Sequence, residues 1–336
     1  MSRGAALAEG KSNILQSVNT ALADALAEDE AVLVLGEDIG DAEEGGVVGV
    51  TRGLSTRFGE HRVRTTPISE QAIIGAAIGA SLAGFKPVAE IMLMNFTTVA
   101  MDMIVNHAAK LRFMSGGQTN VPIVIRTMTG TGFGSGGQHC DYLEAWFAHT
   151  AGIKVVAPSS PADAYGLMRS AIDDPDPVLF IENLPTYWNQ SEAAPPGHRV
   201  PIGKANRLVE GDDVTILAYA RMIQEATPAV AQLAEAGISA ELVDLRTIAP
   251  WDRDAVLASV AKTRRLLIVH EAVTPFGVGA EIAATVSEAL FGQLAAPVKR
   301  LGGAFCPVPF SKPLEMAFAP RTADIVAAAQ QLVGHQ

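Results

Sequence analysis

The stretch TTPISEQAIIGAAIGASLAGFKPVAEIML, residues 65–93, contains the pattern that decides the fold. Its proline-containing turn is followed by residues 70–83, where apolar side chains recur every three or four positions, which predicts a helix. A run of aliphatic residues then extends from Val88 to Leu93, as in a buried strand. Because a continuous apolar strand beside a helix is typical of a sheet covered by helices, the stretch predicts an α/β fold with a mostly parallel sheet.

The same alternation continues along the chain in both directions. In the first half, the sequence predicts further strands at 31–35, 121–127, 154–157 and 178–182, and further helices at 99–111 and 162–172. In the second half, it predicts strands at 214–219, 240–245, 266–269 and 298–301, and helices at 223–236, 252–259 and 279–291. Strands that alternate with helices in this way predict a second α/β unit after the first.

A polar, proline-bearing segment, TYWNQSEAAPPGHRVPIG, interrupts the alternation at about 186–203. It combines turn residues with few periodic apolar positions, which predicts a linker. A chain of 336 residues is also long enough for about two domains of ordinary size. We therefore expect a flexible N-terminus (1–10), a first domain (11–185), a linker (186–203) and a smaller α/β domain (204–336).

Composition and charge exclude several classes of protein. Hydrophobic residues make up 49% of the chain and charged residues 18%, which is typical of a globular protein. The 36 acidic and 25 basic residues give a net charge of -11, so we expect no binding to nucleic acid or to a membrane surface. Cys140 and Cys306 are too few for a disulfide framework, and the N-terminus lacks the pattern of a secretory signal. These features favour a bacterial cytoplasmic protein.

Two acidic residues follow predicted turns or strands, where a carboxylate can serve a function. Glu70 comes directly after the turn and begins the predicted helix. A structural interpretation is that Ser69 or Thr66 caps the helix and that Glu70 is stabilised by the helix dipole. Glu37, in LGEDIG, is either functional or simply solvated. Local sequence favours capping for Glu70 and decides between neither alternative for Glu37.

The glycine-rich segment GTGFGSGGQHC, residues 130–140, follows a predicted strand and contains His139. No GK[ST] follows it and no ribose-binding acid lies beyond it, so neither a Walker loop nor a Rossmann fingerprint is present. Glycines at such a place let the backbone approach a ligand closely and bring a polar side chain into a cleft. His139 is the candidate for that side chain, with an ordinary loop histidine as the alternative.

Ordered blocks of sequence run through nearly the whole chain, from about residue 11 to 330. They include LGEDIG, TRGLSTRFGEHRVRTTPISEQ, NHAAKLRFMSGGQ, GGQH, EAWFAH, GIKVVAPSSPADAYGLM, DPVLFIEN, LVDLRTIAPWD, FGVGAEI and PVPFSKPLE. In these blocks the chain resembles the beta subunits of the thiamine-diphosphate-dependent decarboxylating component of 2-oxo acid dehydrogenase complexes. The resemblance implies a transketolase-like pyrimidine-binding domain with a parallel sheet, followed by a smaller transketolase C-terminal domain.

The resemblance assigns a cofactor role to Glu70. In the family, the glutamate of the TPISE motif hydrogen-bonds a ring nitrogen of the aminopyrimidine and promotes the tautomer that removes the thiazolium proton. Phe96, in MNF, matches the aromatic residue that stacks on the pyrimidine, and Ile68 matches an aliphatic contact. Glu37 completes the predicted set of cofactor-binding residues. With this resemblance, we favour the functional interpretation of Glu70 over simple capping.

His139 matches the family's active-site histidine, which is proposed to stabilise intermediates and to assist acyl transfer to a lipoyl group. Family members often read QHSQ here, whereas this chain reads QHCD, so Asp141 stands close to the histidine along the chain. The family also has a potassium site built from backbone carbonyls. The corresponding positions here are Ile123, Ala171, Ile172, Asp174 and Asp176.

A motif that the family's cofactor requires is missing from this chain. Transketolase-like enzymes hold the diphosphate through Mg and a GDG motif, and no GDG occurs here. The resemblance therefore implies an alpha subunit that holds the diphosphate and Mg, a heterotetramer of two alpha and two beta chains, and a lipoyl-bearing acyltransferase core as a further partner. His270 and Glu271, in the second domain, are interpreted as structural.

The substrate predicted from the resemblance is a 2-oxo acid. The strings NF, MSGGQ and FGVGAEI favour pyruvate. A branched-chain 2-oxo acid dehydrogenase, an acetoin dehydrogenase and a complex-free acyloin-forming carboligase are the alternatives, the last because of the residues after His139. A scaffold without a part in the chemistry is a further hypothesis, which the presence of both Glu70 and Phe96 disfavours.

Overall fold

The computed structural model describes residues 9–334, and its contacts divide them into two compact units. Unit 1 comprises 9–129 and 146–202, and unit 2 comprises 130–145 and 203–334. Each unit is an α/β domain with a mostly parallel sheet, which confirms the predicted fold class. The predicted flexible segment 1–10 lies outside the described residues, apart from a turn at 9–10.

Unit 1 is built on a parallel sheet whose strand order is β6-β7-β5-β4-β2-β3. Its strands are β2 (Val32–Glu37), β3 (Val63–Thr66), β4 (Lys86–Leu93), β5 (Val124–Thr129), β6 (Lys154–Val156) and β7 (Val178–Asn183). In the central strands β5 and β7 every residue is buried, because helices cover both faces of the sheet. Parallel strands also bring all their carboxyl ends to one edge.

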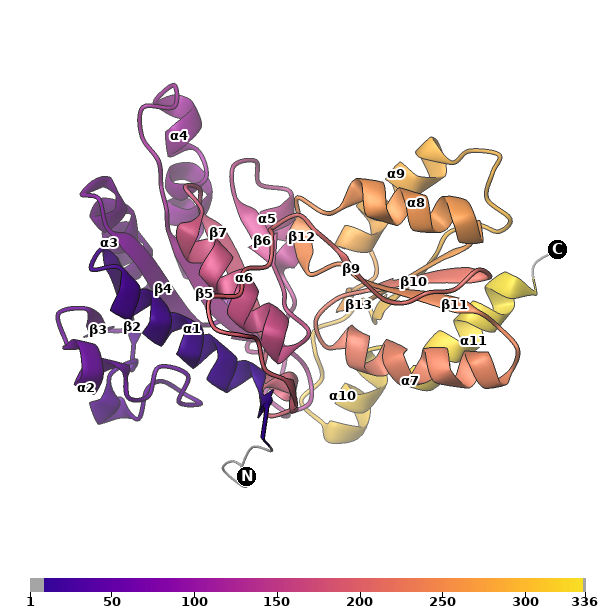
Figure 1. Ribbon diagram of the computed structural model, residues 1–336, viewed down its shortest axis with the longest axis horizontal. Helices are drawn as coiled ribbons and strands as arrows, with labels where there is room; N and C mark the ends of the chain where they lie inside the picture. Colours follow the sequence, from indigo (N-terminus) through magenta and orange to yellow (C-terminus); the bar gives the residue numbers. More distant parts are fainter. Residues whose placement is uncertain (1–8, 335–336) are drawn as a thin grey trace. The chain divides into compact units, whose positions relative to one another are not determined.

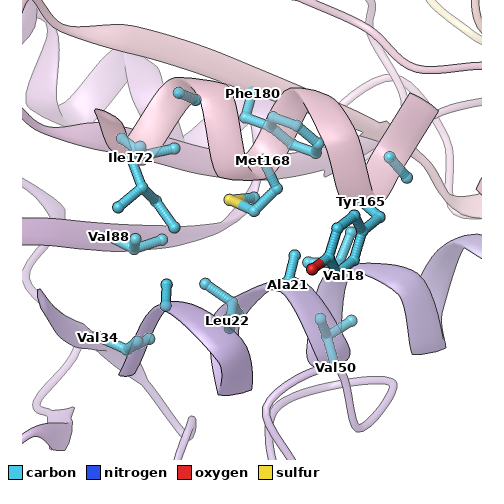
Figure 2. Close-up of a cluster of buried hydrophobic side chains, with 14 of the residues drawn as sticks. Val18, Ala21, Leu22, Val34, Val50, Val88, Tyr165, Met168, Ile172 and Phe180 are labelled. Atoms are coloured by element: carbon cyan, nitrogen blue, oxygen red, sulfur yellow. The ribbon is translucent and has the colours of Figure 1, made fainter. Parts of the chain in front are cut away.

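Two long helices, α1 (Ile14–Glu28) and α6 (Pro161–Asp173), pack together over one face of this sheet (Figure 1). Each begins at a side-chain cap, since Asn13 accepts the N–H of Gln16 at 2.9 Å and Ser160 accepts that of Asp163 at 3.1 Å. Figure 2 shows the core between the two helices and the strands, where the labelled side chains include Leu22, Val34, Val88, Met168 and Phe180.

The other face of the sheet is covered by α3 (Glu70–Leu82), which packs on β4. The predicted single helix at 99–111 is wrong. The chain there forms a 3-10 segment (Met94–Ala100), a π-helical segment (Asp102–Ala108) and the short α4 (Leu111–Met114). Two threonine hydroxyls near the start donate to carbonyls three residues back, Thr97 to Met94 and Thr98 to Asn95. Such local bonds compete with a regular helical ladder in the 3-10 segment, but both threonines precede residue 99, so these bonds do not explain the π-helical segment.

The segment predicted as a linker, 186–203, is largely folded onto unit 1. Its strand β8 (Ser191–Glu192) pairs in antiparallel fashion with β1 (Lys11–Ser12). Tyr187 is fully buried, and Val200 is part of the unit 1 core. The contacts thus place the end of unit 1 at residue 202, and they assign 130–145 to unit 2 although that segment interrupts unit 1 in the sequence.

Unit 2 has a sheet of order β14-β13-β10-β11-β9, in which only the edge strand β9 is antiparallel. The strands of this sheet are β9 (Asn206–Val209), β10 (Val214–Ala218), β11 (Ala240–Asp244), β13 (Leu266–Val273) and β14 (Lys299–Gly303). The short β12 (Thr247–Ala249) is also in unit 2 but is not part of this sheet. Helices α7 (Met222–Glu235) and α11 (Thr322–Val333) cover one face, and α8 (Arg253–Thr263) and α9 (Val278–Ala289) the other (Figure 1).

The remaining elements are short. They are α2 (Leu54–Phe58), α5 (Glu144–Ala148) and α10 (Lys312–Phe318), with 3-10 turns at Asp41–Glu43 and Leu184–Thr186. Among residues 9–334, no helix has the length and apolar character that crossing a bilayer requires.

Candidate functional site

The carboxyl edge of the unit 1 sheet brings three of the predicted site residues into one region. Glu37 is the last residue of β2, and Glu70 begins α3 four residues after β3 ends. Phe96 lies in the 3-10 segment that directly follows β4. Because β2 pairs in parallel with both β3 and β4, the segments that carry these side chains leave the sheet at neighbouring positions.

Glu70 stands at a helix terminus that lacks the predicted cap. Ser69 makes no capping bond; its hydroxyl and that of Thr66 instead lie 3.4 Å and 3.0 Å from the carbonyl oxygen of Pro67. The capping interpretation therefore does not hold for either hydroxyl. The carboxylate is half-buried at the positive end of α3, where an acidic group is favoured.

Electrostatics connects Glu70 to Glu37. The pKa of Glu37 is raised, first by burial and then by the negative charges of Asp38 and Glu70. A raised pKa favours the protonated form of Glu37, and a carboxyl group that holds a proton can exchange it with a ligand. The geometry thus joins two of the predicted residues in one electrostatic environment.

Apolar surface accompanies these carboxylates. Ile68, in the turn before Glu70, is 75% exposed, which is unusual for so large an aliphatic side chain. Phe96 is half-buried, so its ring is only partly covered by the protein. A carboxylate, an aromatic ring and an uncovered aliphatic side chain are the groups that a flat heteroaromatic ring needs for a hydrogen bond, stacking and an apolar contact.

The sequence interpretation missed a buried ionic network behind this edge. Arg126 forms ion pairs with both Glu90 and Glu182, and Tyr187 donates a hydrogen bond to Glu182 at 2.6 Å. Burial raises the pKa of Glu90 more than Arg126 lowers it, and the charges of Glu182 and Glu37 raise it further. A signal was present, because VAEIM, VIR and FIEN each place a charge within an otherwise apolar strand.

His139 belongs to unit 2, in the segment 130–145 that follows β5. Its side chain is half-buried. The next residue, Cys140, is buried among Val308, Phe318 and Ala319. Burial raises the pKa of its thiol to about 11, so the thiol is protonated at neutral pH and is no nucleophile. Cys140, which distinguishes QHCD from QHSQ, is therefore a packing residue.

Four of the five predicted potassium positions lie between the last turn of α6 and the start of β7, and Ile123 directly precedes β5. The carbonyl of Ile123 accepts the N–H of Val178 at 3.0 Å, and that of Ala171 accepts the N–H of Asp174 at 3.3 Å. Each of these carbonyls retains a second lone pair for a cation. The side chains differ, because Asp174 pairs with Lys154 at 2.6 Å and Asp176 with Arg112 at 2.6 Å. Any potassium ion here would depend on the carbonyl oxygens.

A cavity of about 620 Å³ opens in unit 1, with Arg112, Lys154 and Asp176 in its lining. Lys154 begins β6 and Asp176 precedes β7, so the cavity lies at the amino-terminal edge of the sheet. Glu37 lies at the opposite edge. The cavity is consequently separate from the predicted cofactor-binding residues. In the described part of the chain, no three His, Cys, Asp or Glu side chains form a group that could hold a metal ion.

Two family models together match most of the chain. Residues 11–187 match the family described as the transketolase pyrimidine-binding domain, and residues 203–325 match the transketolase C-terminal domain.

Relatives with full-length similarity carry two kinds of name. The chain is 43% identical over 329 residues to the beta subunit of acetoin:2,6-dichlorophenolindophenol oxidoreductase from Cupriavidus necator, covering 96% of this chain and 97% of the relative. It is 44% identical over 322 residues to the mitochondrial pyruvate dehydrogenase E1 component subunit beta-1 of Arabidopsis thaliana, covering 95% and 88%. It is 41% identical to the pyruvate dehydrogenase E1 component subunit beta of Staphylococcus epidermidis, covering 94% and 97%.

Among solved structures, the chain is similar to a split-gene transketolase described as an inactive beta4 tetramer. The TM-score is 0.78 at 22% identity, covering 96% of this chain and 98% of the other. Transketolase from Leishmania mexicana gives a TM-score of 0.71 at 16% identity, covering 98% of this chain and 46% of the other. These two likenesses show the fold.

Proposed function

Because the chain belongs to the transketolase-like family of beta subunits found in pyruvate dehydrogenases and acetoin oxidoreductases, we propose that it is the beta subunit of a pyruvate dehydrogenase E1 component. The proposed reaction is the oxidative decarboxylation of pyruvate with acyl transfer to a lipoyl group. The observation that carries the proposal is the placement of Glu37, Glu70 and Phe96 where β2, β3 and β4 end, with burial and the charges of Asp38 and Glu70 raising the pKa of Glu37.

The cofactor of the proposed reaction is thiamine diphosphate, which supplies the electron sink for decarboxylation when bound. The residues at the sheet edge fit its pyrimidine half. Glu70 would hydrogen-bond a ring nitrogen, Phe96 would stack on the ring, and Ile68 would cover an apolar part of it. The raised pKa of Glu37, caused first by burial and then by the charges of Asp38 and Glu70, favours a protonated carboxyl group at the same sheet edge. We assign the diphosphate and Mg to an alpha subunit.

His139 is the proposed group for acyl transfer. An imidazole can donate or accept a proton, which suits reductive acylation of the lipoyl disulfide: its S–S bond breaks, one sulfur gains the acyl group, and the other sulfur gains a proton. The proposal thus includes a lipoyl-bearing acyltransferase core as a partner, in addition to an alpha subunit in a heterotetramer of two alpha and two beta chains.

Potassium is proposed as a structural ion, held by backbone carbonyls at Ile123, Ala171 and Ile172, with Asp174 and Asp176 nearby. The free lone pairs of the Ile123 and Ala171 carbonyls support it. The bacterial cytoplasm remains the proposed location, supported by the small number of cysteines and by the bacterial relatives.

A second candidate is an acetoin oxidoreductase, because one relative of that name is as similar to the chain as the pyruvate dehydrogenase subunits are. Branched-chain 2-oxo acids and a carboligase reaction are further possibilities within the same chemistry.

The test is to copurify the chain with an alpha subunit encoded beside it and to measure thiamine-diphosphate-dependent reduction of 2,6-dichlorophenolindophenol. Pyruvate, branched-chain 2-oxo acids and acetoin are supplied in parallel. Reduction with pyruvate alone supports the proposal, whereas reduction with acetoin alone identifies the second candidate. Decarboxylation with accumulation of an acyloin and no dye reduction identifies the carboligase.

A further inference from the structure

We propose that Glu315 is a positioning residue that fixes the segment carrying His139 by binding backbone N–H groups at its start. Glu315 lies on α10, about 180 residues further along the chain, and belongs to the motif PVPFSKPLE. The inference rests on the role proposed above for His139, and it adds a residue that determines where this histidine stands.

The contacts of Glu315 are all with the glycine-rich part of the segment. The N–H of Gly132 donates to its Oε1 at 2.7 Å, and the N–H of Gly134 lies 3.0 Å from its Oε2 and 3.2 Å from its Oε1. Hydrogen bonds from backbone N–H groups to an ionised carboxylate are about twice as strong as bonds between neutral groups. A single side chain thus fixes two positions of the segment.

Burial shows that this arrangement is not an ordinary surface contact. Glu315 is 2% exposed, and within residues 9–334 no Lys, Arg or His side chain forms an ion pair with it. A buried carboxylate without a cation is unfavourable unless hydrogen bonds compensate for the lost water. Here the N–H groups of the segment provide that compensation, so the carboxylate and the segment depend on each other.

Two neighbouring contacts hold the residue before Gly132. The N–H and the hydroxyl of Thr131 both donate to Oε1 of Glu271, each at 2.7 Å. Arg221 donates to the carbonyl and hydroxyl oxygens of Thr131, at 2.9 Å and 3.0 Å. Glu271, interpreted from sequence as structural, thus supports the same stretch of backbone as Glu315.

The far end of the segment is fixed in a similar way. Glu144 is fully buried, and the hydroxyl of Tyr219 donates to its Oε1 at 2.7 Å. His139 therefore stands between two anchored ends of the segment. Glu271 and Glu315 bind its start, and at its end the segment's own Glu144 binds Tyr219.

The effect of Glu315 reaches the histidine's neighbour. Besides burial, the charges of Glu315 and Glu271 raise the pKa of Cys140, which follows His139 in the chain. Both carboxylates are consequently close enough to act on the turn that carries the histidine.

The glycines of the segment have a physical explanation in this arrangement. Gly134 and Gly136 have φ values of +67° and +74°, which favour glycine. A Cβ at Gly136 would lie 3.3 Å from the ring of Phe310, and one at Gly137 would lie 3.0 Å from Cβ of Pro307. The close approach that the sequence predicts is therefore to residues of the chain itself. The N–H groups of Gly132 and Gly134, which could bind a phosphate, donate to Glu315 instead.

The experiment compares Glu315→Gln and Glu315→Ala with Glu241→Gln in the complete alpha–beta complex. Glu241 is a matched control in unit 2, because it is also buried and accepts a backbone N–H from a glycine, Gly211, at 3.4 Å. Amide hydrogen exchange of the peptide spanning 130–141 reports whether the segment is held. Steady-state kcat and KM, with and without His139→Ala, report whether the effect passes through the histidine.

We expect Glu315→Gln to speed exchange in this peptide about 10-fold and to lower kcat about 10-fold, and Glu315→Ala to lower kcat about 100-fold, with KM little changed. Glu241→Gln leaves both readouts at the wild-type level. In the His139→Ala background, Glu315→Ala has no further effect on kcat, since the two residues act as one unit.

Two outcomes overturn the inference. Unchanged exchange in both Glu315 variants means that the carboxylate does not hold the segment. An additive loss of kcat in the double variant means that Glu315 acts on the fold and not through His139. Wild-type turnover in His139→Ala alone contradicts the proposed role of the histidine, and the exchange data still decide separately whether Glu315 holds the segment.

Discussion

The two places that carry the predicted catalytic residues are built in different ways. Glu37, Glu70 and Phe96 stand where regular strands end, so the register of a parallel sheet positions them. His139 stands in an irregular segment that is positioned by buried carboxylates from distant parts of the chain. The comparison teaches that a sheet edge can be predicted from periodicity, whereas a segment held by single side chains cannot.

The largest expected effect lies at the sheet edge. Glu70→Gln replaces the carboxyl group by an amide, which cannot exchange a proton with the pyrimidine ring, and we expect thiamine-diphosphate-dependent dye reduction by the alpha–beta complex to fall about 100- to 10,000-fold. Glu60→Gln, an exposed substitution in the same unit, is the control and leaves the rate unchanged. A wild-type rate in Glu70→Gln complexes that assemble normally contradicts the catalytic assignment and revives the hypothesis of a scaffold.

The next effect concerns the network behind that edge. Arg126→Met leaves Glu90 and Glu182 buried without their shared cation, and we expect the free energy of unfolding to fall by about 3–5 kcal/mol. Urea unfolding of the variant measures this loss. Arg64→Met, at an exposed position of β3, should change the free energy by less than about 0.5 kcal/mol. An equal, small loss in both variants means that the network does not stabilise unit 1.

Much of unit 1 was predictable because its signals are local and periodic. Strands β2, β4 and β7 lie within a few residues of their predicted ranges, and so do α3 and α6. Helix α1 was not predicted, although its apolar residues Ile14, Val18, Ala21 and Ala25 follow helical spacing. In place of the helix expected at 99–111, the chain forms the end of a 3-10 segment, a π-helical segment and the start of α4, a distinction that apolar spacing alone does not make.

The site was predictable only in part. Resemblance to a family supplied Glu70, Phe96 and His139, and local sequence alone favoured capping for Glu70. Nothing in the sequence near His139 indicates that Glu315 binds the backbone of the same segment, because about 180 residues separate the partners and only the fold brings them together.

Glu144, at the end of the segment that carries His139, makes the stability of unit 2 depend on pH. Burial raises the pKa of Glu144 from 4.5 to about 7, so the folded state binds this proton more tightly than the unfolded state does. The stability that Glu144 contributes is complete below pH 4.5 and is lost as the pH rises through about 7, by an amount on the order of 3 kcal/mol. Glu144→Gln should remove this decline, as measured by urea unfolding between pH 4.5 and 8.

His270 acts in the opposite direction within the same range. Burial lowers the pKa of His270 to about 4, so its contribution to stability is lost as the pH falls from about 6.5 towards 4. The informative quantity is therefore the difference between Glu144→Gln and the wild type at each pH. A difference that is constant across the range means that Glu144 does not titrate in the folded protein.

The smallest expected effect on stability comes from alanine substitutions at two glycines, which distinguish backbone strain from a displacement of the segment that carries His139. Gly136 and Gly237 have φ values of +74° and +78°, so alanine at either position costs about 1–2 kcal/mol of stability. Only at Gly136 does a new Cβ meet a neighbour, the ring of Phe310 at 3.3 Å; at Gly237 nothing lies within 4 Å. We expect similar losses in thermal unfolding for both variants but a lower kcat only for Gly136→Ala. Equal kcat values would show that the segment tolerates displacement, and the contrast between a rigid sheet edge and a precisely held segment would then lose its functional meaning.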